Sequence, residues 1–197
     1  MRHVSVTRTV LVLLVLGVTA CGSSGGDSAG LPAGTVLDPF TNDGAGSQLV
    51  PFGRVQIGPR RLQKAQTFVV PRTGRIVAID YIAGGADSDL IIRIMPAPGG
   101  VIDEDDNNAL VTTRVIEANV QPPGFGSFLR FRDPGIPVTQ GDVLALTFEH
   151  TDGSGQIKQS SSSYADGTSF ERDNEGITMW TPAASNADLV FGIYIAP

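Results

Sequence analysis

Cysteine, histidine and long apolar runs are all scarce in this chain of 197 residues. Cys21 is the only cysteine, so no disulfide can staple the fold. His3 and His150 are the only histidines, and a zinc site needs three or four Cys, His or carboxylate ligands. A zinc hydrolase is therefore not expected. The one long apolar run, residues 9–18, is too short to cross a bilayer core of about 30 Å as a helix.

Catalytic motifs are missing as well. No phosphate-binding loop occurs, and the segment nearest to a nucleophile elbow, residues 124–128 (GFGSF), lacks the final glycine. His150 follows an apolar run and precedes Thr151-Asp152-Gly153, which predicts a surface residue at a strand end rather than a catalytic base. The sequence therefore predicts no enzyme. A pair of carboxylates that hydrolyses a glycosidic bond is the alternative, because the distance between two carboxylates depends on the fold and cannot be read from the sequence.

The N-terminus has the features of an export signal. Arg2 and Arg8 supply positive charge, an apolar run follows, and Thr19 and Ala20 are small. Residues 18–21 (VTAC) resemble the lipobox of bacterial lipoproteins. This resemblance implies that the thiol of Cys21 receives a diacylglyceryl group, that residues 1–20 are removed as a signal peptide, and that a lipid anchor holding palmitate tethers the chain to the membrane. The alternative is a plain secretion signal with an incidental cysteine.

The anchor resemblance also bears on location and on the rest of the chain. In lipoproteins an aspartate after the cysteine favours inner-membrane retention, and this chain has Gly22 instead. We therefore expect an extracytoplasmic location on the cell membrane or the outer membrane. Residues 21–34 are rich in Gly and Ser and predict a tether, followed by one domain over residues 35–197. Loss of Arg2 and Arg8 changes the formal charge from −6 to −8, which argues against a nucleic-acid partner.

The domain alternates short apolar runs with turn signals. Runs such as 65–70 (AQTFVV), 75–83 (RIVAIDYIA) and 143–149 (VLALTFE) end at Pro, Gly or Asp-Gly. This spacing predicts eight to ten short strands and no helix longer than two turns. Residues 71–74 (PRTG) predict a hairpin between the first two runs, and residues 143–149 predict a central strand covered on both faces. An all-β, two-sheet antiparallel β-sandwich is the expected architecture.

The order of the core segments is similar to that of jelly-roll β-sandwich modules of bacterial extracellular proteins. The segments that carry the resemblance are AQTFVVP, LIIRIM, PVTQGDVLALTFE, YADGTSF and DLVFGIYI, within residues 63–195. The resemblance implies a jelly-roll-like fold, and such modules often look like carbohydrate-binding domains. It is a pattern of core residues and turns and not of a site, so it cannot define the function.

An acidic loop offers a candidate metal site. Residues 103–108 (DEDDNN) place six oxygen-bearing side chains in a row, and Asp103, Asp105 and Asn107 alternate as in many calcium loops. Calcium is therefore a candidate cofactor. The glycine and the distal glutamate of an EF-hand loop are missing, so a solvated acidic loop between strands is the alternative. The segment 87–89 (DSD) is a weaker example of the same pattern.

The aromatic residues Trp180 and Tyr164 are the candidate ligand-binding residues. Both are expected on loops or at strand ends, where a flat ring could stack on a sugar. The alternative for Trp180 is a partly buried core or rim residue. Together these features predict a lipid-anchored, non-catalytic module that binds a glycan or a protein partner. A structural or assembly module of the envelope without a small ligand is the alternative.

Overall fold

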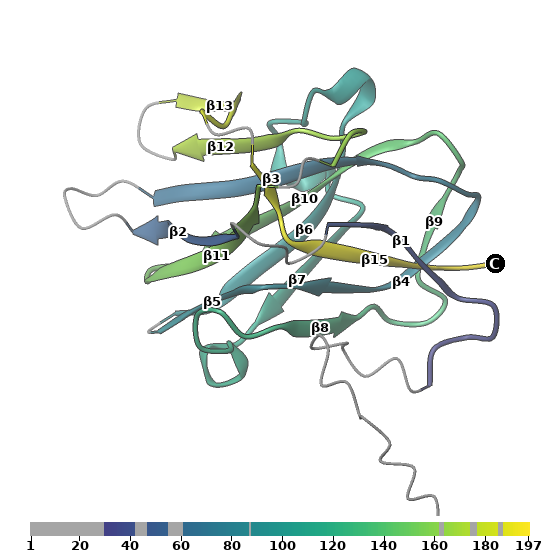
Figure 1. Ribbon diagram of the computed structural model, residues 1–197, viewed down its shortest axis with the longest axis horizontal. Helices are drawn as coiled ribbons and strands as arrows, with labels where there is room; N and C mark the ends of the chain where they lie inside the picture. The colour runs from purple at the N-terminus through teal and green to yellow at the C-terminus, as the bar shows by residue number, and fades with distance from the viewer. Residues whose placement is uncertain are drawn as a thin grey trace, which may run out of the picture.

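Two antiparallel sheets pack face to face in the computed structural model (Figure 1). The structure describes residues 30–41, 47–54, 61–86, 88–161, 164–173, 177–184 and 187–197. The smaller sheet has the order β1-β15-β4-β8, with β9 beside β4. Its strands are β1 (Val36–Phe40), β15 (Phe191–Ala196), β4 (Gly74–Tyr81), β8 (Ser127–Arg130) and β9 (Ile136–Val138).

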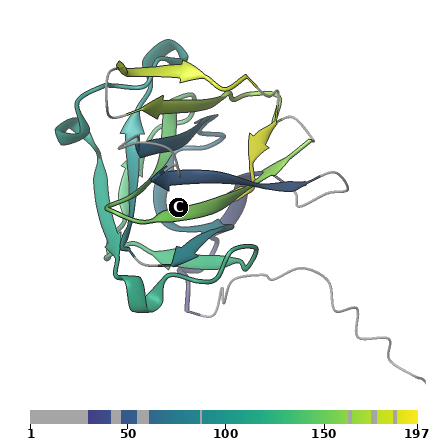
Figure 2. The ribbon, with the colours of Figure 1, turned by 90° about the vertical axis from the view of Figure 1, so that its left-hand side faces the viewer.

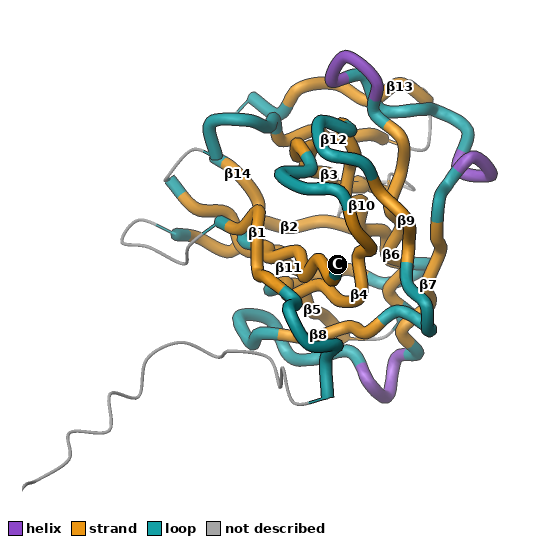
Figure 3. The backbone as a smooth tube through the Cα atoms, turned by 90° about the vertical axis from the view of Figure 1, so that its right-hand side faces the viewer, coloured by secondary structure: helices purple, strands orange, loops and turns teal. Residues whose placement is uncertain are grey.

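The larger sheet has the order β14-β11-β2-β3-β10-β6-β7, with β5 beside β11 and the hairpin β12–β13 beside β3. These strands are β14 (Asp188–Leu189), β11 (Ser154–Ser160), β2 (Gln48–Arg54), β3 (Arg61–Val69), β10 (Val143–His150), β6 (Leu90–Pro96), β7 (Val111–Val115), β5 (Ala83–Ala86), β12 (Ser169–Asp173) and β13 (Ile177–Pro182). Three single turns of 3-10 helix, η1 (Pro98–Gly100), η2 (Asp106–Asn108) and η3 (Glu117–Asn119), lie on the periphery (Figure 3). This architecture confirms the predicted all-β sandwich.

The main core lies between the sheets. Strand residues alternate between two faces, so every second residue of β10 points at the smaller sheet. Leu144, Leu146 and Phe148 do so, and they pack in one cluster with Ile79 and Ile193 of the smaller sheet. All five side chains are at most 5% exposed. Burial of this kind is worth about 1.5–3 kcal/mol for each large side chain, and it holds the two sheets together.

A second apolar cluster covers the outer face of the larger sheet. Ala145 of β10 and Met95 of β6 face outward, and Ile102 of the 97–110 loop and Phe170 of β12 pack in the same cluster. The hairpin β12–β13, at the top of Figure 2, continues the larger sheet beyond β3, and its Phe170 lies opposite Ala65 on this outer face. Strand β10 also pairs with β3 on one side and β6 on the other. The expectation of a central strand covered on both faces is confirmed.

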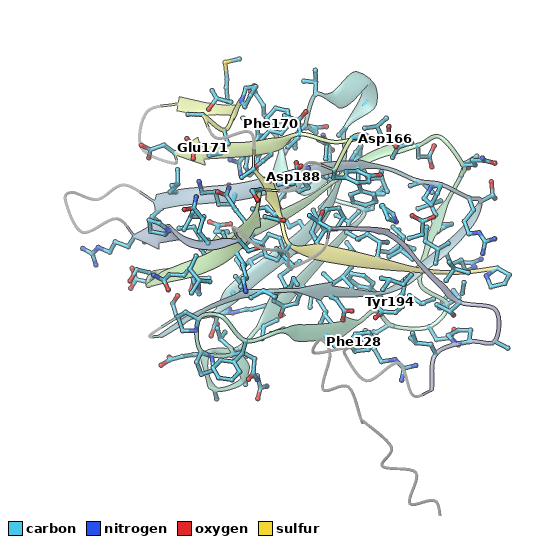
Figure 4. The ribbon with its side chains drawn as sticks, viewed as in Figure 1. Phe128, Asp166, Phe170, Glu171, Asp188 and Tyr194 are labelled. Carbon is cyan, nitrogen blue, oxygen red and sulfur yellow. The ribbon has the colours of Figure 1, made fainter. Side chains whose placement is uncertain are left out.

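A third, smaller cluster lies on the outer face of the smaller sheet, where the described chain begins. Leu31 packs against a group that includes Tyr194 and Phe128. The two rings meet edge to face at 5.4 Å, and the Tyr194 hydroxyl donates to Asp80 Oδ2 at 2.6 Å. Figure 4 shows Phe128 and Tyr194 next to each other beside β8. Arg130 Nη2 donates to the Gly30 carbonyl at 2.5 Å, so the chain enters the domain alongside β8.

The predicted hairpin between residues 65–70 and 75–83 is wrong. The turn is present, but β3 joins the larger sheet and β4 the smaller one. Strand β3 pairs with β10 and β12, whereas β4 pairs with β15 and β8. A reversal signal fixes the change of direction but not the strand's partner, and here the chain crosses from one layer to the other. Among the described residues, no helix is long and apolar enough to span a membrane.

Candidate functional site

Trp180 and Tyr164, the two candidate ligand-binding aromatics, do not lie in one site. Trp180 in β13 packs on the outer cluster of the larger sheet, with the guanidinium carbon of Arg172 at 4.6 Å from the ring centroid. Tyr164 packs against the core between the sheets, edge to face with Phe191 at 5.9 Å. The larger sheet separates the two rings, so a single sugar ring cannot stack on both. One face of Trp180 is already occupied by Arg172.

In the acidic loop, the side-chain oxygens of Asp103 and Asp105 accept hydrogen bonds from amide groups of the loop itself. Asp103 Oδ1 accepts from the Asp105 backbone N–H at 2.9 Å, and its Oδ2 accepts from Asn108 at 2.9 Å. Asp105 Oδ1 accepts from both the backbone and the side-chain amide of Asn107. The hydrogen bond from Asp105, followed by that from Asn108, lowers the pKa of Asp103. In the described part of the chain no three Asp, Glu, His or Cys side chains gather as metal ligands.

Two buried arginines clamp this loop to the larger sheet. Arg172 Nη2 lies 2.8 Å from Asp106 Oδ1, and its Nε donates to Gln63 Oε1 at 2.8 Å. Arg93 lies 3.4 Å from the other oxygen of Asp106 and 2.8 Å from Glu149. Both arginine side chains are at most 11% exposed, and each charge has a carboxylate partner. Paired charges of this kind fix one arrangement of the loop, so we assign this network a structural role.

His150 is fully buried, so its expected place at the surface is wrong. Its Nδ1 lies 3.0 Å from Ser88 Oγ, and its ring lies 4.6 Å from that of Phe52. Glycine is required opposite the ring, because a Cβ at Gly155 would collide with Nε2. Nε2 is buried and has no hydrogen-bond partner in the described structure. Burial lowers the pKa of His150, against smaller opposing effects of backbone groups at residues 89, 88 and 84.

The contact between Ser88 and His150 brings a hydroxyl to an imidazole, as in nucleophilic catalysis. Ser88 is 5% exposed and His150 0%, so a substrate has no access to either. No described carboxylate orients the ring from its far nitrogen, which carries no hydrogen bond. A working pair needs both access and an orienting group. This contact therefore supports packing and not an acyl-transfer site.

A groove opens between the edge strands of the two sheets. It has a volume of about 540 Å³ and lies between β7, the edge strand of the larger sheet, and β8, the edge strand of the smaller one. Its apolar lining includes Tyr81 of β4, Val115 of β7 and Leu129 of β8. Burial raises the pKa of Tyr81, so the phenol in this lining is neutral at physiological pH.

The groove is also lined by polar side chains that make no hydrogen bond to another described residue. Thr113, Asn119 and Gln121 line it, and in the described structure none of these side chains makes a hydrogen bond. Arg114 is the one charged residue that lines it. Hydroxyl and amide groups over an apolar surface are the usual lining of a small-molecule site, where a few polar groups set the orientation. Sequence reasoning missed this site because its residues come from a strand, a turn and a loop that each look unremarkable.

The wall of the groove is held by Asp89 and by β5. Asp89 Oδ1 accepts from the Glu117 backbone N–H at 2.7 Å, and Oδ2 accepts from Arg114 Nε. These two contacts, in that order, lower the pKa of Asp89. On the other side, Gly84 of β5 lies against the carbonyl of Gln121, where a Cβ would clash with that oxygen. The loop after β7 is thus fixed at both ends, and the groove is formed before any ligand arrives.

Comparisons with known proteins add a fold likeness only. No family model matches the chain, and no curated protein matches it. Among solved structures it is similar to the clostridial cysteine protease Cwp84 after propeptide cleavage, at 8% identity and a TM-score of 0.51. The match covers 81% of this chain and 39% of that one. The chain therefore spans less than half of that protein, and the likeness concerns the fold and not the protease activity.

Proposed function

We propose that this protein is a cell-envelope lipoprotein whose β-sandwich is a non-catalytic glycan-binding module. The observation that supports the glycan is the groove between β7 and β8, where Thr113, Asn119 and Gln121 make no side-chain hydrogen bond to another described residue and lie beside an apolar surface. Sugars present hydroxyls at their edges and C–H groups on their faces, and this lining offers partners for both. The groove therefore replaces the pair of Trp180 and Tyr164 as the proposed binding site.

The anchor and the groove belong to the same end of the molecule in this proposal. Nine peptide bonds separate Cys21 from Gly30, and a fully extended chain of that length spans at most about 32 Å. Gly30 is held by Arg130, the last residue of β8. Since β8 also borders the groove, a lipid on Cys21 would keep the groove within a few tens of ångströms of the membrane surface. The glycan is then one of the cell's own envelope.

A protein partner is the second candidate. Phe125 is 62% and Ile116 53% exposed, and both lie in the loop segments next to the groove. Leu49, itself 37% exposed, lies beside the same loop, since a Cβ added at Gly124 would be 3.6 Å from its Cδ1. Exposed apolar side chains near one another are typical of protein contacts. An assembly module of the envelope would use this surface and leave the groove empty.

A glycan array and three variants separate these readings. The purified protein should bind at least one oligosaccharide on the array, and the double variant Asn119→Ala/Gln121→Ala should weaken that binding at least about tenfold. Trp180→Ala is the matched control for the aromatic site and should leave binding unchanged. If Trp180→Ala abolishes binding and the double variant does not, the site lies where the sequence placed it. No binding to any glycan, with capture of a partner lost in Phe125→Ala, would favour the protein reading.

The anchor has its own test. Cells labelled with radioactive palmitate should yield a labelled protein that partitions into the detergent phase of Triton X-114. Cys21→Ser should remove the label and move the protein to the aqueous phase, because no other residue of the chain can carry the thioether. A variant that still partitions into detergent would refute lipidation at Cys21.

A further inference from the structure

We propose that the outer face of the smaller sheet is a docking surface for an anionic lipid membrane. This inference rests on the lipid anchor of the proposed function and adds the orientation of the domain on the bilayer. It starts from a difference between the two sheets. Among the described residues, the basic side chains that pair with a carboxylate lie on the larger sheet: Arg61, Lys64, Arg93, Arg114 and Arg172.

The smaller sheet has arginines without such partners. Arg75 of β4 and Arg130 of β8 belong to its strands, and Arg72 and Arg132 lie exposed just before β4 and just after β8. None of the four pairs with a carboxylate of the described chain. Arg72, Arg75 and Arg132 make no hydrogen bond to another described residue either. Their charges are therefore available to a partner outside the domain.

The strand register places Arg75 and Arg130 on the outer face of the smaller sheet. Residues directly opposite each other on neighbouring strands point to the same face. Arg75 lies opposite Ala196 and Arg130 opposite Ala78, and both alanines belong to the outer cluster that contains Tyr194. Three positions along β4 and one step between strands separate the two arginines, which corresponds to about 10 Å. The two charges thus lie side by side on one surface.

Few acidic side chains oppose these arginines. Asp80 lies on the outer face of β4, where its Oδ2 accepts from the Tyr194 hydroxyl at 2.6 Å, and Asp133 lies in the turn after β8. Asp38 of β1 lies toward Tyr164 instead, because burial, followed by nearby carboxylates that include Asp38, raises the pKa of that phenol. The outer face therefore has an excess of positive charge on a domain whose formal charge is negative.

The described chain enters the domain on this same face. Arg130 Nη2 donates to the Gly30 carbonyl at 2.5 Å, and Leu31 packs on the outer cluster. The proposed anchor at Cys21 is at most about 32 Å upstream of Gly30 along an extended chain. A tether this short keeps the face at a high effective concentration near the headgroups, so a weak attraction suffices to orient the domain.

An anionic bilayer is the partner that satisfies both the tether and the charge. The lipid on Cys21 would be inserted in that bilayer, and its phosphate groups complement the arginines. Basic side chains are attracted to anionic headgroups within a Debye length, about 10 Å at 0.1 M salt. The acidic remainder of the domain is repelled by the same headgroups, which favours the orientation that places the smaller sheet on the membrane.

The test measures how close each sheet lies to the headgroups. The lipoprotein purified from cells is reconstituted into phosphatidylcholine vesicles, with or without phosphatidylglycerol, that contain a headgroup-nitroxide lipid as a quencher of tryptophan. Trp180, the only tryptophan, lies in β13 of the larger sheet and is the reference. The variant Trp180→Phe/Leu37→Trp moves the reporter to the outer face of the smaller sheet, because Leu37 lies opposite Tyr194 and is 38% exposed.

Quenching at position 37 should exceed quenching of Trp180 in the vesicles with phosphatidylglycerol, and the excess should shrink as salt rises. In the reporter chain, Arg75→Gln/Arg132→Gln should lower the ratio of docked to undocked protein at least about tenfold. Arg130 is left intact because it holds Gly30.

Arg54→Gln/Arg61→Gln is the matched control. These residues flank the hairpin between β2 and β3 of the larger sheet, so the variant removes the same charge from the other layer. It should leave the quenching unchanged. Equal losses in the two double variants would reduce the effect to overall charge and overturn the inference. Thermal unfolding of each variant checks that it is folded.

The outcomes distinguish the docking surface from the anchor. Protein that floats with the vesicles but is quenched equally at the two positions, or equally with and without phosphatidylglycerol, overturns the docking surface and keeps the anchor. Stronger quenching of Trp180 than of the reporter at position 37 overturns it in favour of the opposite face. Folded protein that does not float with the vesicles overturns the anchor and this inference with it.

Discussion

The buried imidazole of His150 makes the stability of this protein depend on pH in a predictable direction. The ring is 0% exposed, its Nδ1 has Ser88 Oγ at 3.0 Å, and its Nε2 has no hydrogen-bond partner among the described residues. A second proton would therefore sit in a closed, uncharged site beside the ring of Phe52. Burial lowers the pKa of His150 in the folded state for this reason.

The sign follows from proton counting. The unfolded chain binds a proton at His150 as the pH falls through about 6.5, while the folded protein stays neutral there until the pH reaches its lower pKa. Between these values the unfolded state holds more protons, so the free energy of unfolding falls as the pH falls. One group contributes a slope of at most about 1.4 kcal/mol per pH unit, and the contribution is complete above pH 6.5.

Chemical denaturation of the purified protein and of His150→Asn, followed by circular dichroism from pH 8 to pH 5, tests this. The variant keeps a hydrogen-bonding group for Ser88 but cannot titrate, and loss of the ring should cost about 1–3 kcal/mol at pH 8. Burial raises the pKa of Asp80 and of Asp188, so these two groups increase the free energy of unfolding as the pH falls. Both are present in the variant, so their effect cancels in the difference between the two proteins. The two stability curves should converge as the pH falls. Parallel curves would refute the account.

Three other predictions concern packing, the arginine clamp and the metal. Phe148→Ala, at 0% exposure, should cost about 3–5 kcal/mol in denaturation, whereas Phe125→Ala, at 62%, should stay within about 0.5 kcal/mol; similar costs would contradict the burial assigned to them. Arg172→Met should destabilise the protein by about 1–3 kcal/mol and make the 103–108 loop the first site of limited proteolysis, and an unchanged cleavage pattern would speak against the clamp. Calcium at the acidic loop stays a prediction: it requires that calcium raise the thermal midpoint and EDTA lower it, and a midpoint indifferent to both would contradict it.

The strands could be predicted from the sequence because their signal is local. In residues 143–149 the side chains on both faces of the strand are largely apolar. This pattern indicates a strand covered on both faces, as β10 is. The pairing of strands could not be predicted, because it depends on distant segments. On the outer face Ala65 of β3 lies opposite Phe170 of β12, which is 105 residues later (170 − 65). On the inner face Phe68 lies opposite Leu144 of β10, which is 76 residues later (144 − 68). The turn at residues 71–74 gave no information about either partner.

Burial of a single polar residue was the hardest feature to predict. His150 precedes Thr-Asp-Gly, a local pattern typical of a surface turn. What buries the ring is the absence of side chains on three other strands, at Gly53, Gly85 and Gly155, whose close approach would exclude any Cβ. Each glycine taken alone predicts only a bend or a weak strand. Their convergence on one imidazole exists only in the folded chain.

The groove shows the same limit from the functional side. Residues 110–120 (LVTTRVIEANV) resemble one long strand, but β7 ends at Val115 and η3 turns the chain out of the sheet. That turn places Asn119 in the lining of the same groove as Thr113, and it is fixed by Asp89, whose carboxylate accepts hydrogen bonds from both the Glu117 backbone and Arg114. In the sequence, Asp89 belonged to a short acidic triplet that suggested a weak cation site. In the structure its carboxylate instead holds Arg114, a cation of the protein itself.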